Sequence, residues 1–438
     1  MKICIVGTGY VGLVTGVCLA DFGNTVICVD KDPKRVKSLG AGTLPFYEPG
    51  LLEMLLRNVK SKRLSFEMNL DAAARWADIL FITVGTPPMS SGEVDVSAVL
   101  DVAKAIAKAF KKKIRKSNIN QFKIIVNKST VPVGMGDIVT KVMTESGIRD
   151  KYFSVVSNPE FLREGSAIAD FLNPNRIVIG ASNNRAFNTI AELYRPLNAH
   201  IIFTDVKTAE LIKYASNAFL ATKVSFINEI ANICERVKAD VTQIADAIGL
   251  DSRIGRSFLN AGLGYGGSCL PKDVLALTQL AKSSGYEPQL ITAVNRVNEL
   301  QTDHFITKIK NTFKSIKNKK IAILGLSFKP ETDDLREAPS LKIINALQKL
   351  GAKISAYDPV AEKKAQLILS NVAFGPSLND VIKGTDAIVA ITEWPEFIEL
   401  DLEKTRKLVR GAVIFDGRNI FNPKKVREAG FKYYGVGR

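Results

Sequence analysis

Histidine is the scarcest reactive residue in this sequence: only His200 and His304 occur among 438 residues. Neither stands at a spacing from cysteine or a carboxylate that is typical of zinc sites, so we expect no metal centre and find little basis for a cysteine–histidine pair. The five cysteines include no C-x-x-C pair, and their number is odd. This argues against a disulfide framework and favours thiols in a reducing cytoplasm.

Long apolar runs are also missing. No stretch of about 20 uninterrupted apolar residues occurs, so we predict no membrane span. The first 20 residues imitate a signal peptide, but four glycines interrupt them and a strand pattern follows at once, so we predict no export signal. The net charge is +16, yet the one dense basic run, "KKKIRK" at 111–116, continues a helical pattern. A solvated helix end is therefore favoured over a nucleic-acid surface, and we expect no nucleic-acid partner.

Short β-branched runs alternate with helical stretches in the first 205 residues, which is typical of a doubly wound parallel sheet. The predicted strands are "KICIVG" (2–7), "TVICVD" (25–30), "DILFITVG" (78–85), "KIIVNKS" (123–129), "FSVVSNP" (153–159), "RIVIG" (176–180) and "HIIFT" (200–204). Residues 205–240 contain neither proline nor glycine and predict one long helix. Helical pattern continues to about residue 317.

The last third of the chain repeats the order of the first. "KKIAILGLSF" (319–328), "AKISAYDPV" (352–360) and "GTDAIVAITEWPEF" (384–397) parallel three N-terminal segments, and "AVIFDGRNIF" (412–421) adds a strand. We therefore predict an α/β protein with two Rossmann-like domains joined by a long central helix and a helical bridge. The expected boundaries are 1–205, 206–317 and 318–438.

The segment "GTGYVG" places Gly7, Gly9 and Gly12 as G-x-G-x-x-G between a predicted strand and a predicted helix. These glycines allow a tight turn, close approach of a pyrophosphate and close helix–strand packing, and the helix N-terminus favours the phosphates. Asp30 ends the next strand, where a carboxylate accepts the ribose hydroxyls of NAD and repels a 2′-phosphate. Lys31 follows it and leaves some tolerance of NADP open.

Other polar residues stand where ligands of such sheets bind, after the predicted strands. The second domain lacks the triple glycine, but Lys329 and Arg336 suit a phosphate-bearing ligand, with plain surface charge as the alternative. Glu160 and Glu164 would share one face if their segment is helical. Lys213 and Asn217 are likewise four apart on the long helix and point either to solvent or to a site.

Cys269 lies in "GYGGSCLPKD" (264–273), whereas the other four cysteines stand in apolar strand or helix patterns and are predicted to pack in the core. The glycines allow unusual dihedral angles and leave room for a substrate to approach the sulfur. Lys272 brings positive charge that favours a thiolate, with Asp273 beside it. A thiol near a nicotinamide cofactor indicates oxidation of an aldehyde through a covalent hemithioacetal.

With these motifs the sequence resembles the UDP-glucose 6-dehydrogenase family, within the nucleotide-sugar 6-dehydrogenases that also act on GDP-mannose and UDP-N-acetyl-hexosamines. The resemblance covers nearly the whole chain and rests on segments that occur in the family's order. They are "GTGYVG", "LPFYEPGL", "KSTVPVG", "SNPEFLREGSAIADFLNPNRIVIG", "ELIKYASNAFLATKVSFINEI", "RIGRSFLNAGLGYGGSCLPKD", "GLSFKPETDDLREAPS" and "FDGRN".

The resemblance implies a four-electron oxidation of UDP-glucose to UDP-glucuronate with two NAD, by a homodimer formed through the central helix. By similarity Cys269 attacks the C6 aldehyde, Lys213 stabilises the oxyanion with help from Asn217, and Glu160 and Asp273 transfer protons or activate water, with Thr130 holding a water. The cofactor-binding residues implied are Gly7, Gly9, Tyr10, Val11, Gly12, Asp30, Arg35, Thr86, Thr130, Glu164, Lys272 and Lys329. The substrate-binding residues implied are Glu160, Phe161, Leu162, Lys213, Asn217, Arg253, Phe258, Tyr265, Gly266, Lys329 and Arg418.

Within this resemblance Arg253 reaches the substrate across the dimer interface. One departure concerns Asn260, where mammalian-type relatives carry a lysine, so that contact is not expected here. The alternative reading is the same chemistry on another nucleotide sugar. A two-electron alcohol or hydroxy-acid dehydrogenase and a basic nucleic-acid-binding protein are the more distant alternatives.

Overall fold

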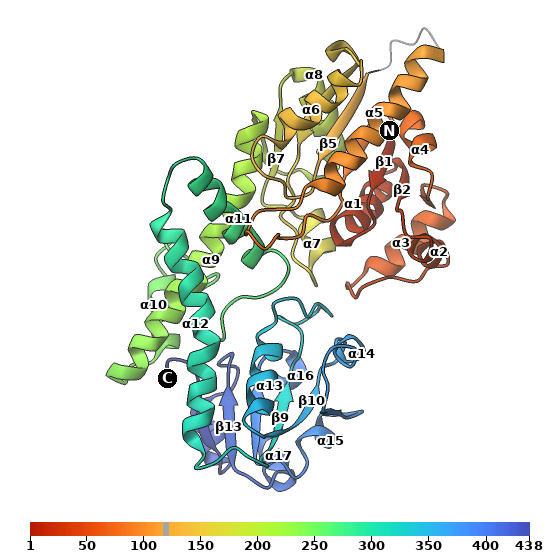
Figure 1. Cartoon of the computed structure of the whole chain (residues 1–438). Coiled ribbons are helices and arrows are strands. Elements are labelled where there is room, and N and C mark those ends of the chain that lie inside the picture. Colours follow the sequence, from red (N-terminus) through yellow and green to blue (C-terminus); the bar gives the residue numbers. More distant parts are fainter. Residues whose placement is uncertain (117–121) are drawn as a thin grey trace. The chain divides into compact units, whose positions relative to one another are not determined.

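The computed structural model describes residues 1–116 and 122–438, and the side chains of all of these except 113–116. The chain divides into two compact units, Met1–Ser216 and Asn217–Arg438, and the boundary falls inside the long helix α9 (Val206–Val237). Each unit is built around one sheet (Figure 1). The predicted long helix is therefore confirmed, and so is the α/β fold with two largely parallel sheets.

The sheet of the first unit has the strand order β3-β2-β1-β4-β5-β6-β7-β8. Its strands are β1 (Lys2–Val6), β2 (Thr25–Val29), β3 (Leu64–Glu67), β4 (Ile79–Ile82), β5 (Lys123–Asn127), β6 (Phe153–Ser157), β7 (Ile177–Ala181) and β8 (Ile201–Thr204). Seven of these match the predicted strands, and β3 was not predicted. The prediction of a fully parallel sheet was wrong at one place, because β7 pairs antiparallel with β6.

Helices cover both faces of this sheet, as the buried clusters show. One face packs against α1 (Tyr10–Asp21), α2 (Pro33–Gly40), α3 (Leu51–Lys60), α7 (Ala167–Leu172) and α8 (Asn184–Tyr194). The other packs against α4 (Leu70–Trp76), α5 (Ser97–Lys116) and α6 (Met135–Glu145). The basic run at 111–116 ends α5 as predicted, although the side chains of 113–116 lie outside the described part of the structure.

The second unit contains a smaller sheet with all strands parallel and the order β11-β10-β9-β12-β13-β14. Its strands are β9 (Lys320–Leu324), β10 (Lys353–Tyr357), β11 (Val372–Phe374), β12 (Ala387–Ala390), β13 (Val413–Asp416) and β14 (Lys432–Tyr434). Numbered from its own first strand, this order is 3-2-1-4-5-6, the order of a dinucleotide-binding fold. The predicted second Rossmann-like domain is confirmed, while the short strands β11 and β14 were not predicted.

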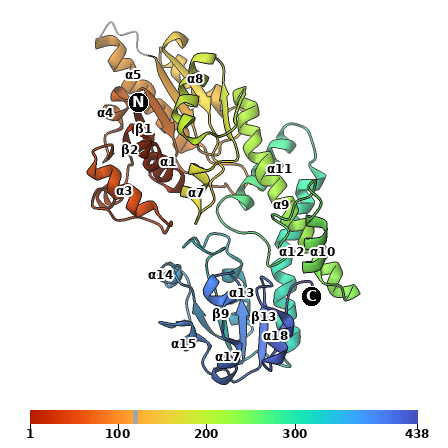
Figure 2. The same cartoon turned by 180° about the vertical axis from the view of Figure 1, so that it is seen from behind.

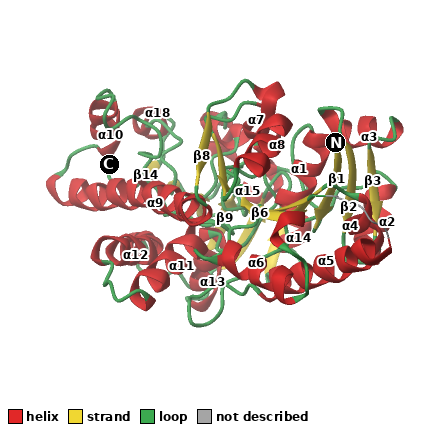
Figure 3. Cartoon of the chain, turned by 90° about the horizontal axis from the view of Figure 1, so that it is seen from above, coloured by secondary structure: helices red, strands yellow, loops and turns green. Residues whose placement is uncertain are grey.

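The helical part of the second unit consists of four helices. They are the end of α9, then α10 (Val241–Gly249), α11 (Leu270–Ser283) and α12 (Gln289–Thr312). Figure 3 shows α9 and α12 side by side, where Asn232 Nδ2 donates to Gln301 Oε1 at 3.0 Å. The chain ends beside α10, since Val241 N donates to Gly437 O at 2.9 Å (Figure 2).

The remaining helices of the second unit flank its sheet. α13 (Pro339–Lys349) packs on one face together with α12, and α14 (Glu362–Ala365) lies after β10. The other face is covered by α15 (Leu378–Ile382), α16 (Pro395–Ile398), α17 (Leu402–Leu408) and α18 (Pro423–Glu428). In the described part of the chain, no helix combines the length and the apolar character that a membrane crossing needs.

Candidate active site

The glycine turn after β1 has the geometry that its sequence predicts. Gly7 has a φ of +102°, and a Cβ added to Gly12 would lie 1.9 Å from the carbonyl oxygen of Gly7. A Cβ added to Gly9 would meet nothing within 4 Å. The first and third glycines are thus required by the protein itself, while the second leaves open space at the N-terminus of α1. This turn fits the pyrophosphate of a dinucleotide.

Asp30 follows β2 and points back at the glycine turn. Its Oδ2 accepts hydrogen bonds from Thr8 N at 2.9 Å and Thr8 Oγ1 at 2.6 Å, and Arg35 Nη1 lies 3.3 Å away. Burial raises the pKa of Asp30, but these hydrogen bonds and the charge of Arg35 outweigh burial and hold the pKa below its usual value. The carboxylate is therefore ionised and suited to the ribose hydroxyls of NAD.

Two threonines from neighbouring strand ends meet beside this turn. Thr86 follows β4 and Thr130 follows β5, and Thr86 Oγ1 donates to Thr130 O at 2.9 Å. The structure thus brings together two residues that the family resemblance assigns to the cofactor, from loops 44 residues apart in sequence.

Glu48 is a buried residue of this region that the sequence did not single out. It lies in the loop before α3, and its carboxylate is hydrogen-bonded to the Tyr10 hydroxyl. Gly165 N donates to Glu48 Oε2 at 2.7 Å, and Ala167 N donates to Glu48 Oε1 at 2.7 Å. Glu48 therefore fastens the loop of Glu164 to the first turn of α1. The motif "LPFYEPGL" was the available signal, but its partners lie about 40 and 120 residues away.

Glu160 and Lys213 form a buried ion pair. Lys213 Nζ lies 3.0 Å from Glu160 Oε1, and both side chains are only about 5% exposed. Leu162 N donates to Glu160 Oε2 at 2.5 Å, and Lys213 Nζ also lies 5.4 Å from the centre of the Phe161 ring. Burying both charges is tolerated because each has the other and hydrogen-bond partners. An ammonium and a carboxylate held together out of water are well placed to move a proton and to stabilise an oxyanion.

The segment that carries Glu160 and Glu164 is irregular, not helical, between β6 and α7. The condition under which these two carboxylates would share one helix face is therefore not met. They come close to the site for a different reason, because the loop leaves the carboxyl end of a central strand, where ligands of such sheets bind.

The second unit holds the other part of the predicted catalytic set. Asp273 is 1% exposed, and its two oxygens are both engaged, by Asn217 Nδ2 at 2.6 Å and by Lys272 Nζ at 2.7 Å. Asn217 follows Lys213 by four residues along α9, one helical turn later. Asp273 in turn follows Cys269 by one turn of α11, because Asp273 N donates to Cys269 O at 2.9 Å.

Cys269 is the exposed cysteine of the chain, whereas Cys4, Cys18, Cys28 and Cys234 are buried thiols, as predicted. Cys269 is the N-cap residue of α11, and the Ser268 hydroxyl lies 3.6 Å from its sulfur. The N-terminus of a helix stabilises negative charge within its first turn. This position therefore favours the anionic, nucleophilic form of the thiol.

The glycines before Cys269 serve a purpose other than the predicted clearance for a substrate. A Cβ on Gly266 would lie 2.2 Å from Glu337 O, and one on Gly267 would lie 2.8 Å from the Phe328 ring. Gly264 has a φ of +94°, and a Cβ added to it would lie 2.6 Å from Asn298 Oδ1. The expectation of free space was wrong, because these glycines let the cysteine loop pack closely on its neighbours in the same unit.

Arg418 ties the cysteine loop to the second sheet. Its guanidinium donates to Ile391 O at 2.9 Å, Gly264 O at 3.2 Å and Phe328 O at 3.2 Å. Lys329 stands beside this cluster, with its Nζ 5.6 Å from the centre of the Phe328 ring. Both residues were predicted to bind the substrate, and both lie at the carboxyl edge of the second sheet, after β9 and β13.

The other predicted substrate residues of this unit lie on the loop between α10 and α11. Phe258 has a φ of +66°, a strained value for a side chain of this size and one that is common at functional sites. Tyr265 is largely buried, and its N donates to Asn298 Oδ1 at 2.8 Å. Arg253 is 87% exposed and paired with Asp251 at 2.5 Å. Asn260, the departure noted above, accepts from Arg256 Nη1 at 2.7 Å.

The predicted site residues therefore fall into two sets, each ordered within its own unit. The first unit holds Gly7, Gly9, Tyr10, Val11, Gly12, Asp30, Arg35, Thr86, Thr130, Glu160, Phe161, Leu162, Glu164 and Lys213. The second holds Asn217, Arg253, Phe258, Tyr265, Gly266, Cys269, Lys272, Asp273, Lys329 and Arg418. Across residues 1–116 and 122–438, no cluster of three or more histidine, cysteine or acidic side chains could hold a metal ion.

A doubly wound sheet with a dinucleotide turn, an ionised aspartate after its second strand and a buried lysine–glutamate pair defines the class of dinucleotide-dependent dehydrogenases. Within this class, the chain belongs to the UDP-glucose/GDP-mannose dehydrogenase family. Family models match the NAD binding domain at residues 1–198, the central domain at 207–300 and the UDP binding domain at 322–423.

Relatives match the chain from end to end. It is 49% identical to UDP-glucose 6-dehydrogenase TuaD of Bacillus subtilis (strain 168), over all of this chain and 93% of the relative. A UDP-glucose dehydrogenase structure from Pyrobaculum islandicum superposes with a TM-score of 0.91 at 38% identity, covering 99% of this chain and 97% of that one. A UDP-D-ManNAc dehydrogenase structure from Pyrococcus horikoshii gives 0.86 at 26% identity, covering 100% and 99%.

Proposed function

We propose that this protein is an NAD-dependent UDP-glucose 6-dehydrogenase that oxidises the C6 alcohol of UDP-glucose to the carboxylate of UDP-glucuronate. The observation that carries the proposal is the single exposed cysteine, Cys269, at a helix N-terminus in a chain that matches UDP-glucose 6-dehydrogenases over its whole length. The family also contains enzymes named for other nucleotide sugars, and the lower identity to these favours UDP-glucose.

The cofactor fits the first unit. We assign the pyrophosphate to the turn of Gly7, Gly9 and Gly12 and the adenosine ribose to Asp30 and Arg35. When bound, NAD accepts a hydride from the substrate carbon, once for each of the two oxidation steps. Thr86, Thr130 and Glu164 follow strand ends or lie near them in the same unit and would line this site.

The proton transfers, the covalent step and the final hydrolysis depend on side chains of the protein. A C6 alcohol is not acidic, so a base must take its proton as hydride leaves, and the buried Glu160–Lys213 pair suits that step. The Cys269 sulfur then adds to the C6 aldehyde and forms a hemithioacetal, whose oxyanion Lys213 stabilises together with Asn217. Loss of the second hydride leaves a thioester. Water, activated beside Glu160 or Asp273, hydrolyses it and returns the thiol and the carboxylate product.

The substrate test is an assay of NADH production with a panel of UDP- and GDP-sugars. We expect turnover with UDP-glucose and two NADH for each sugar consumed, because the alcohol loses four electrons in all. Strong preference for another nucleotide sugar would instead support the alternative hypothesis, the same oxidation of GDP-mannose or a UDP-N-acetyl-hexosamine. A yield of one NADH per sugar would contradict the thioester route and indicate a two-electron dehydrogenase.

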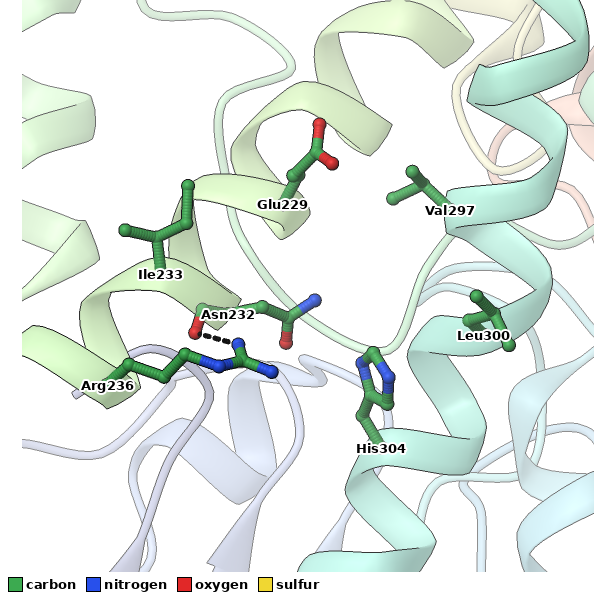
Figure 4. Close-up of a pocket in the computed structure, with 7 residues that line it drawn as sticks. All are labelled: Glu229, Asn232, Ile233, Arg236, Val297, Leu300 and His304. Carbon is green, nitrogen blue, oxygen red and sulfur yellow. Dashed lines mark hydrogen bonds between the residues drawn. The ribbon is translucent and has the colours of Figure 1, made fainter.

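We further propose that the chain acts as a homodimer through α9. Three apolar side chains at seven-residue spacing, Phe219, Phe226 and Ile233, are 66%, 49% and 48% exposed on this helix. A repeat of seven is typical of helices that pack along each other. Beside them, α9 and α12 form a hollow that Ile233, Val297 and Leu300 line with apolar groups (Figure 4). A second copy of the helix would cover this surface.

The substitution Phe226→Glu is expected to convert dimers to monomers in size-exclusion chromatography with light scattering, because it buries a charge in the proposed interface. Turnover should fall with it, since Arg253 would complete the partner's site. Leu52→Glu, which changes an exposed leucine on α3, is the matched control and should leave the mass at two chains. A dimer that survives Phe226→Glu would place the interface elsewhere.

We propose three domains with one role each: NAD binding at 1–205, dimerisation at 206–317 and UDP-sugar binding at 318–438. The matches of the three family domains to nearly these ranges support this division. We also propose a cytoplasmic location, supported by the odd number of cysteines and the lack of a C-x-x-C pair, which favour thiols in a reducing compartment.

A further inference from the structure

Lys128 is a buried lysine of the first unit to which the reaction above gives no role. It directly follows β5, in the segment "KSTVPVG", and its side chain is 4% exposed. Its Nζ donates to Asn158 Oδ1 at 3.1 Å, Asn158 O at 3.3 Å and the Tyr194 hydroxyl at 3.4 Å. Three acceptors match the three protons of an ammonium, but none of the three carries charge.

These partners connect Lys128 to the loop that carries Glu160. Asn158 precedes Glu160 by two residues, and it is itself held on both sides of its amide. Tyr194 OH donates to Asn158 Oδ1 at 2.5 Å, and Asn158 Nδ2 donates to Val178 O at 2.8 Å. The ammonium of Lys128 thus contacts the loop two residues before Glu160, whereas Lys213 contacts Glu160 itself.

The titratable groups around Lys128 come from four elements. The carboxylate of Glu160, on the loop, raises the pKa of Lys128, and the ammonium of Lys213, on α9, lowers it. Tyr194 on α8 faces it through the hydroxyl, and burial raises the pKa of this phenol, as it does for the thiol of Cys18 on α1 near Tyr194. Both are therefore neutral near pH 7. The cluster holds two cations and one carboxylate, in a place where water screens them poorly.

We propose that Lys128 is a positioning residue whose hydrogen bonds to Asn158 fix the Glu160 loop and whose buried positive charge attracts the Glu160 carboxylate. The inference rests on the proposed function, in which the Glu160–Lys213 pair moves the protons of the reaction. Burial lowers the pKa of Lys128 to about 8, despite the attraction of Glu160. Its charge is therefore present at neutral pH and lost under mildly alkaline conditions.

The test is the pH profile of kcat for Lys128→Met. Removing the positive charge that attracts the Glu160 carboxylate should move the acid limb to higher pH, by roughly one pH unit, whereas the alkaline limb should stay in place because Lys128 is already neutral there. A merely structural role lowers the height of the profile and leaves both limbs in place. An unmoved acid limb in an active Lys128→Met enzyme would overturn the inference.

Two further variants separate charge from contact. Tyr194→Phe removes a hydroxyl that contacts both Lys128 and Asn158 but keeps the ammonium, and its limbs should stay where the wild type has them. Asn158→Asp places a carboxylate next to Lys128 that offsets its positive charge, and it should move the acid limb upward, as Lys128→Met does. If Lys128→Met does not fold, Asn158→Asp alone decides, and an unmoved acid limb in it overturns the inference. A wild-type enzyme without turnover of UDP-glucose overturns the proposed function and this inference together.

A measurement of stability provides a readout independent of activity. We expect Lys128→Met to fold, because Asn158 Oδ1 keeps the Tyr194 hydroxyl and the buried Glu160 carboxylate keeps Lys213. Between about pH 8 and the unfolded pKa of about 10.5, the unfolded state holds a proton on Lys128 that the folded state has lost. Raising the pH in this window therefore stabilises the wild type relative to Lys128→Met. A stability difference that stays flat through it would contradict a buried, perturbed charge and overturn the inference.

Discussion

Replacing Cys269 by serine is expected to lower the turnover number for UDP-glucuronate by at least about a thousandfold, because a hydroxyl is a far weaker nucleophile than a thiolate. Any aldehyde that the serine does capture would be oxidised to an ester, which water cleaves more slowly than a thioester. Mass spectrometry of the intact Cys269→Ser protein after incubation with UDP-glucose and NAD should then show the mass of a bound sugar nucleotide.

The other four cysteines are buried, so one of them can serve as a control for the loss of a thiol. Cys234 lies in the core of the same unit and is 1% exposed, so Cys234→Ala removes a thiol of equal chemistry from a place that no substrate reaches. Its turnover should remain within a few-fold of the wild type. Iodoacetamide should label Cys269 and spare the four buried thiols. Full turnover in Cys269→Ala would refute the covalent route and leave a dehydrogenase that hydrates a free aldehyde.

The main features of the fold could be predicted because they depend on short segments. The glycine turn and the aspartate after the second strand are both local patterns, and the structure reproduces both. Strand β3 (Leu64–Glu67) was missed because it has four residues, two of them exposed, and lies at the sheet edge. The antiparallel direction of β7 could not be seen either, since a buried strand has the same pattern in both directions.

The candidate catalytic residues were predicted from motifs, but their contacts could not be predicted. Glu48 joins Tyr10 to Gly165, and Lys128 meets Asn158 and Tyr194, so each contact closes a loop of 30 to 120 residues. Buried polar side chains need such partners, and a single sequence does not say which distant segment supplies them. The glycines of the cysteine loop illustrate the same limit. Their sequence suggested open space, whereas Phe328 and Glu337 occupy it.

Substitution of Lys213 by methionine is expected to lower kcat by a factor of roughly 10²–10³, the usual cost of losing one oxyanion stabiliser. The change in KM should be small, because an oxyanion exists in the transition state and not in the bound substrate. Steady-state kinetics with UDP-glucose measures both values. An effect confined to KM would assign Lys213 to substrate binding.

The ion pair with Glu160 adds a second expected effect that has to be separated from the first. Lys213→Met leaves the carboxylate of Glu160 buried without its ammonium, so the melting temperature should fall. The double variant Glu160→Gln/Lys213→Met replaces both charges by neutral groups of similar size and should recover much of the lost stability. It should not recover kcat, because neither the base nor the oxyanion partner has returned. Recovery of kcat together with stability would mean that Lys213 serves folding alone, and that another group stabilises the oxyanion.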